Sequence, residues 1–87
     1  MRPFRLEFKA SARRDLKRIP REESARIIAA VETWARGEPH VDVEKLTDVQ
    51  PPEWRIRVGR WRALVDRPAA DVIRFLRVLD RKDAYRR

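Results

Sequence analysis

The chain has 87 residues, a formal net charge of +8 and no cysteine. Its length predicts one domain over residues 1–87. The lack of cysteine excludes disulfides and thiolate metal sites within the chain. No apolar run approaches the roughly 20 residues that a membrane span needs, and the N-terminal residues have no signal-peptide pattern. We therefore expect a cytoplasmic protein with no membrane partner.

The positive charge is concentrated toward the C-terminus. Residues 1–53 hold 11 basic and 10 acidic side chains, whereas residues 54–87 hold 11 basic and 4 acidic side chains. This asymmetry is typical of a surface that binds a polyanion. An arginine-rich genome would explain why 18 of the 22 basic residues are Arg, but it would not explain their uneven placement.

The N-terminal part of the sequence predicts a strand followed by a helix. Phe4, Leu6 and Phe8 alternate with charged residues, which indicates a half-buried strand. Ser11 is placed to cap a following helix. That helix should end before Pro20, because a residue that precedes proline disfavours the α conformation.

A second helix has the clearest pattern. Glu22 lies in its first turn, and Gly37 ends it. Its apolar stripe consists of Ile27, Ile28, Val31, Trp34 and Ala35. Because the connection to the first helix is short, we expect an antiparallel helical hairpin. Residues 38–53 are polar and contain prolines, so we interpret them as a loop.

A β-hairpin follows, with strands over residues 54–58 and 61–66. Gly59 and Arg60 suit a two-residue type II′ turn. This turn places Arg57 opposite Arg62, and directly opposed residues project from the same face of a sheet.

In this register three arginines share one face of the hairpin. They are Arg55, Arg57 and Arg62, while the apolar residues lie on the other face, toward the helices. Opposed like charges destabilise a hairpin, and such a local conflict points to function. Guanidinium groups bind phosphate in a bidentate manner. Side chains that simply extend into water would give the same pattern, so the pattern alone leaves both interpretations open.

The last strand is expected over residues 72–79, after a connection at residues 67–71. Arg74 and Arg77 blur its alternation, which favours an interior place in the sheet. Tyr85, near the C-terminus, has a ring that can stack on an unpaired base or pack at the rim of the core. The order β-α-α-β-β-β predicts an α+β fold, an antiparallel sheet with a helical hairpin on one face.

Three segments resemble the RelE/ParE toxin superfamily, and the resemblance covers almost the whole chain. Residues 54–62 are similar to the family's aromatic-Arg-x-Arg-x-Gly-x-aromatic-Arg hairpin. Residues 78–86 resemble its His-Arg-Lys-Asp-x-Tyr-Arg ending, and Lys45 with Leu46 resembles its Lys-Leu segment. The resemblance implies the toxin of a type II toxin–antitoxin system, and as partners a small acidic antitoxin and mRNA on the ribosome.

The resemblance also implies an activity, that of a ribosome-dependent, metal-free endoribonuclease without a cofactor. A ribose 2′-OH attacks the adjacent phosphate, which requires a base, a proton for the leaving oxygen and cations for the phosphorane. Carried over to this chain, Arg57 matches the general base and Arg55 a second basic position. Arg62 and Arg81 match residues that stabilise phosphate charge, and Arg81 also assists the leaving group. Tyr85 matches the residue that stacks on a substrate base.

Two positions depart from the family pattern. Arg57 stands where the best-known member of the family has lysine, and arginine stays protonated near neutral pH, which makes it a poor base. Asp80 stands where many relatives have histidine, and it is expected either to neutralise Arg81 or to orient it.

Two other functions share these sequence features. A ParE-like toxin would bind DNA gyrase without cutting RNA, and a non-catalytic module would bind RNA only. A metal nuclease is not expected, because His40 is the single histidine and the nearby acids Asp42 and Glu44 are typical of a solvated loop.

Overall fold

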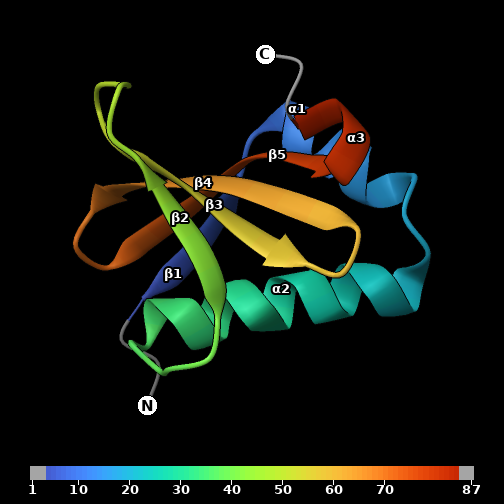
Figure 1. The fold of residues 1–87 in the computed structure, drawn as a ribbon, viewed down its shortest axis with the longest axis horizontal. Coiled ribbons are helices and arrows are strands. Elements are labelled where there is room, and N and C mark those ends of the chain that lie inside the picture. The colour runs from blue at the N-terminus through green and yellow to red at the C-terminus, as the bar shows by residue number, and fades with distance from the viewer. Residues whose placement is uncertain (1–3, 85–87) are drawn as a thin grey trace.

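A computed structural model describes residues 4–84 of the chain (Figure 1). In chain order the elements are β1 Arg5–Phe8, α1 Ala10–Lys17, α2 Arg21–Ala35, β2 Asp42–Leu46, β3 Glu53–Val58, β4 Trp61–Ala69, β5 Val72–Asp80 and α3 Arg81–Ala84. The strands form one sheet in the order β1-β5-β4-β3-β2. The predicted α+β class is confirmed. Two details differ, because β2 is an additional strand and β1 lies parallel to β5.

Helix α2 covers one face of the sheet and builds the core. It runs beneath β3 and β4 in the view of Figure 1 and packs against both strands. Ile27 and Val31 of its apolar stripe are fully buried in one cluster with Ile56, Val65 and Phe75. Burial of each such side chain stabilises the fold by about 1.5–3 kcal/mol. The stripe predicted from helical spacing is therefore confirmed.

Helix α1 covers the part of the β5 edge that β1 leaves open. Strand β1 pairs with β5 only as far as Phe75. Beyond it the Ser11 hydroxyl donates to the carbonyl of Leu76 (2.8 Å), and the backbone N–H of Val78 donates to a carboxylate oxygen of Asp15 (2.8 Å). These side chains satisfy backbone groups that an open sheet edge would leave exposed.

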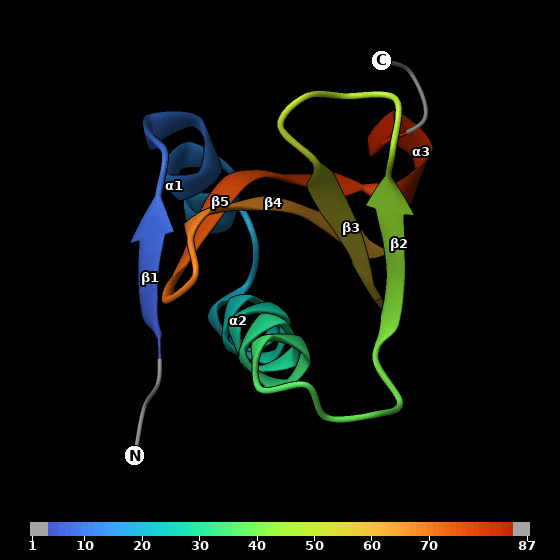
Figure 2. The same cartoon turned by 90° about the vertical axis from the view of Figure 1, so that its left-hand side faces the viewer.

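The role expected for Ser11 is therefore wrong. Helix α1 begins at Ala10, so Ser11 lies inside its first turn and binds the sheet instead of capping the helix. In both views of the fold α1 lies on the other side of β5 from α2 (Figures 1 and 2). The two helices are consecutive, as expected, but they pack against different strands.

The segment expected to be a loop contains strand β2, so that interpretation was incomplete. Residues 42–46 pair with β3 along their whole length. The strand forms an edge of the sheet, most of its side chains are exposed, and even Val43 is 36% exposed. An exposed edge strand buries no alternating apolar face, so periodicity could not reveal it.

Strand β5 lies inside the sheet, between β1 and β4, as its blurred alternation predicted. A register shift explains the blurring. Leu64 of β4 pairs with Arg77, and the next residue of β4, Val65, pairs with Phe75, so Leu76 is an extra residue. This bulge lets Arg74 and Arg77 share a face although they are three residues apart.

The connection between β4 and β5 is shorter than predicted. Strand β4 continues to Ala69, which pairs with Val72, and only residues 70 and 71 form the turn. Within residues 4–84, no helix is long and apolar enough to cross a membrane.

Candidate nucleic-acid interface

The β3–β4 hairpin has the register that the sequence predicts. Val58 pairs with Trp61, and Arg57 pairs with Arg62. Gly59 has a φ of 59°, the left-handed value that the first central position of a type II′ turn requires. A glycine at this position thus fixes which residue faces which along the whole hairpin.

The register separates two sets of side chains. Ile56, Ala63 and Val65 are fully buried on the face toward α2. Three arginines project from the opposite face, which we call the open face: Arg55, Arg57 and Arg62. Their common orientation, expected from the sequence, is confirmed.

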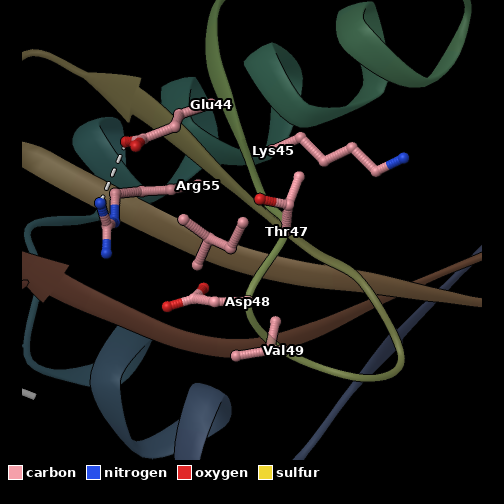
Figure 3. Close-up of a pocket in the computed structure, with 7 residues that line it drawn as sticks. Glu44, Lys45, Thr47, Asp48, Val49 and Arg55 are labelled. Carbon is pink, nitrogen blue, oxygen red and sulfur yellow. Dashed lines mark hydrogen bonds and ion pairs between the residues drawn. The ribbon is translucent and has the colours of Figure 1, made fainter.

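Strand β2 places two carboxylates beside these arginines. One oxygen of Glu44, Oε1, accepts hydrogen bonds from Arg55 Nη1 (3.1 Å) and from Arg57 Nη2 (3.2 Å). Asp42 accepts a further bond from Arg57 Nη1 (3.0 Å). Figure 3 shows Glu44 and Arg55 turned toward each other, whereas Lys45, the next residue of β2, points away.

Sequence reasoning missed this part of the site. Asp42 and Glu44 are two residues apart, the spacing of Arg55 and Arg57 on the neighbouring strand. That matched alternation of charge was the available signal. The segment was interpreted as a loop because it is mostly polar and contains prolines.

The ion pairs of this site remain accessible to water. The Glu44 side chain is 46% exposed, and the Arg57 side chain is 30% exposed. Solvent-exposed pairs contribute only about 0–1 kcal/mol each to stability. An incoming phosphate can therefore displace the exposed Asp42 from Arg57 at little cost.

Arg62 differs from the other two arginines, because no carboxylate of residues 4–84 pairs with it. Its Nη1 donates to the carbonyl oxygens of Gly59 and Trp61, both at 3.0 Å. Its Nε is buried without a hydrogen-bond partner among the described residues. Arg62 is thus held against the turn, and no carboxylate of the described residues offsets its positive charge.

Asp80 pairs with Arg60 of the hairpin turn and not with Arg81, so the expectation that it neutralises Arg81 is not met. Its carboxylate accepts from Arg60 Nε (2.8 Å) and from the backbone N–H of Lys82 (3.1 Å). These two donors, the backbone N–H first, lower the pKa of Asp80. The backbone N–H of Arg81 in turn donates to the carbonyl of Arg60 (2.7 Å). Asp80 thereby fastens the start of α3, and with it Arg81, to the hairpin turn.

Two further residues were singled out from the sequence. Tyr85 lies outside the described residues. His40 is exposed in the connection between α2 and β2, with a φ of 72°. Residues 4–84 contain no group of three or more acidic or histidine side chains that could hold a metal ion.

The fold is similar to that of solved toxin–antitoxin complexes. A chain of the RelB-RelE antitoxin-toxin complex from Methanococcus jannaschii superposes with a TM-score of 0.72 at 29% identity, covering 92% of this chain and 95% of that one. A chain of the toxin-antitoxin complex RelBE2 from Mycobacterium tuberculosis gives a TM-score of 0.66 at 24% identity, with 93% and 94% covered. The latter likeness concerns the fold alone.

These likenesses and the arginine-lined hairpin define the class, the RelE/ParE toxin superfamily. A family model described as the ParE toxin of the type II toxin-antitoxin system parDE matches residues 6–85. The chain therefore belongs to the ParE toxin family. A search of curated proteins found no significant match.

Proposed function

We propose that this toxin is a ribosome-dependent endoribonuclease that cleaves mRNA without a metal ion. The observation that carries the proposal is the group we call the arginine cluster: Arg55, Arg57 and Arg62 on the open face, with Glu44 between the first two. Glu44, held by two guanidinium groups, provides a base. The third guanidinium group, which pairs with no carboxylate within residues 4–84, provides an anion-binding group.

The proposal assigns the general base to Glu44. A family-based assignment to Arg57 requires a protonated guanidinium to take up a proton, which is unfavourable near neutral pH. A carboxylate can accept the proton of a ribose 2′-OH. The 2′ oxygen then bonds to phosphorus, the bond from phosphorus to the 5′ oxygen breaks, and that oxygen takes a proton from solvent. The products are a 2′,3′-cyclic phosphate and a 5′-OH.

The arginines act on the phosphate. Arg57 holds Glu44 in place and donates to a phosphate oxygen, and Arg62 offers a fixed positive charge across the hairpin. Preorganised cations stabilise the charge that develops in the phosphorane more than they stabilise the ground state. Arg81, fastened to the turn through Asp80, would stabilise the negative charge that develops on the leaving oxygen, and Tyr85 would stack on a substrate base.

The test compares two glutamates that carry the same charge and the same kind of partner. Glu44→Gln removes the proposed base, and we expect cleavage on translating ribosomes to fall by about 10²- to 10⁴-fold. Glu38→Gln is the matched control, because Glu38 is also an exposed glutamate paired with an arginine, Arg36, at 2.7 Å. Primer extension on mRNA after induction gives the measurement. Cleavage by Glu44→Gln at the wild-type rate would exclude Glu44 as the base.

The same proposal includes a cognate antitoxin in the cytoplasm. Both structural relatives were solved as toxin–antitoxin complexes. The excess of basic residues after position 53 favours a small acidic partner that covers the open face. Copurification of the toxin with the product of an adjacent short reading frame would identify it.

A second candidate function follows from the family model, which is that of ParE. A toxin of that kind would bind DNA gyrase and leave mRNA intact. Induction would then cause DNA damage without codon-linked cuts, and the purified toxin would inhibit supercoiling by gyrase. In that case Glu44→Gln and Glu38→Gln would be equally toxic.

A further inference from the structure

A polar cavity of about 360 Å³ lies on the open face next to the arginine cluster. The start of α1 forms one wall, the end of the β2–β3 loop and the start of β3 form the other, and β4 and β5 form the floor. Figure 2 shows α1 and the β2–β3 loop on either side of β4 and β5. The polar residues that line the cavity include Lys9, Ser11, Glu53, Asp66, Arg74 and Arg77.

Glu53 is the unusual member of this lining. Its Oε1 atom is buried and has no hydrogen-bond partner within residues 4–84. Across the hairpin Glu53 pairs with Asp66, a second carboxylate that is only 5% exposed. The Asp66 carboxylate already has hydrogen-bond donors, because Arg74 donates to both of its oxygens (3.1 and 2.8 Å). Glu53 is thus a buried acceptor beside a like charge, an arrangement that costs folding free energy.

The chemistry of Glu53 defines the group that would satisfy it. A carboxylate accepts hydrogen bonds through both oxygens, so its best partner presents two donors side by side. Among the RNA bases guanine does so, with N1–H and the 2-amino group on its Watson–Crick edge. Adenine and cytosine place one donor beside a lone pair, and uracil places its donor between two carbonyls. Glu53 therefore favours guanine.

The rest of the lining favours a nucleotide over a cationic side chain of a partner protein. Lys9 lies in the opposite wall, and no carboxylate of residues 4–84 pairs with it. A nucleotide carries both a donor edge for Glu53 and a phosphate for Lys9. An arginine or lysine from a partner would meet Glu53 favourably but would be repelled by Lys9.

The cavity is also within reach of the arginine cluster. Glu53 and Arg55 lie two residues apart on the same face of β3, about 7 Å along the strand. We propose that this cavity binds the guanine base of a nucleotide next to the phosphate held by the arginine cluster. The inference rests on the proposed function for its ligand, RNA, and adds a base preference to it.

The test measures binding in free solution, separately from cleavage. Fluorescence anisotropy at low salt would compare three labelled oligouridines that carry one guanosine, inosine or adenosine. Inosine keeps N1–H but lacks the 2-amino group, so wild-type protein should bind it about ten-fold more weakly than guanosine, the effect of one hydrogen bond to a charged group. Adenosine should bind more weakly still.

Glu53→Gln should abolish the preference, because an amide offers one donor and one acceptor, which match adenine and equally the O6 and N1–H of guanosine and inosine. Asp71→Asn makes the same change of charge at an exposed residue of the β4–β5 turn and should keep the wild-type order. Removing Glu53 also removes a repulsion with Asp66, so the variant should fold.

Equal affinities for the three oligonucleotides, no measurable binding of any, or an unchanged order in Glu53→Gln would overturn the inference. Loss of antitoxin binding by Glu53→Gln, with the RNA order unchanged, would likewise overturn it and assign the cavity to a protein side chain. Failure of the proposed function has a different signature, the absence of mRNA cleavage on translating ribosomes by wild-type protein.

Discussion

Asp15 fastens α1 to the sheet, and its removal should destabilise the fold strongly. Its side chain is only 8% exposed. One oxygen accepts from Arg77 Nε and from the backbone N–H of Val78, both at 2.8 Å, and the other accepts from Arg77 Nη2 at 3.1 Å. In Asp15→Ala the N–H of Val78 loses its partner, which costs about 1–3 kcal/mol. The Arg77 pair is partly exposed to solvent and adds about 1 kcal/mol at most.

We therefore expect Asp15→Ala to lower the free energy of unfolding by about 1–4 kcal/mol, a large part of the stability of a small domain. Urea denaturation followed by tryptophan fluorescence would measure it. Arg77→Ala should cost less, about 1 kcal/mol, because the N–H of Val78 keeps its acceptor. Asp71→Ala, at an exposed turn residue, should cost no more than about 0.5 kcal/mol. Equal losses in Asp15→Ala and Arg77→Ala would refute the role assigned to the Val78 hydrogen bond.

Two further predictions concern the hairpin turn. Gly59→Ala should lower the free energy of unfolding by about 1–2 kcal/mol, because Gly59 has a left-handed φ that residues with a Cβ disfavour. A steric clash adds nothing to this cost, since no neighbouring atom within residues 4–84 would lie within 4 Å of the alanine Cβ. Urea denaturation would measure this loss, and an unchanged urea midpoint would show that the left-handed φ of Gly59 imposes no strain on alanine. Asp80→Asn tests the contact between turn and α3. Because the N–H of Lys82 and the guanidinium of Arg60 lower the pKa of Asp80 below its ordinary 3.8, its stabilisation is present above that pH and is lost as the pH falls below it. The variant should thus be less stable than wild type near neutral pH and should approach it in acid, whereas a difference that stays constant with pH would exclude this linkage.

The hairpin could be predicted because its register depends on local chemistry. A two-residue turn with Gly59 at its first position fixes the partner of each later residue, so the common face of Arg57 and Arg62 followed directly. Helix α2 was predictable for a similar reason, since Ile27 and Val31 belong to a long stripe at helical spacing.

The remaining parts of the site depend on which segments become neighbours in space. Glu44 acquires its role only because β2 lies beside β3, and an exposed edge strand carries little periodic signal. Asp80 is adjacent to Arg81 in sequence, but its partner is Arg60, twenty residues away, which the β4–β5 pairing brings close. Ser11 had the chemistry of a cap and was used by the sheet edge instead. Each of these contacts is tertiary, and no local pattern encodes it.

The carboxylates of β2 make two guanidinium groups carry their own tethered counterions. When RNA binds elsewhere on a basic surface, mobile counterions are released into solution, and this release makes the affinity steeply dependent on salt concentration. At Arg57 a phosphate instead displaces Asp42, which stays attached to the chain, while Glu44 remains paired with Arg55 and Arg57. The toxin's attraction for RNA should therefore fall with ionic strength less steeply than its number of arginines suggests.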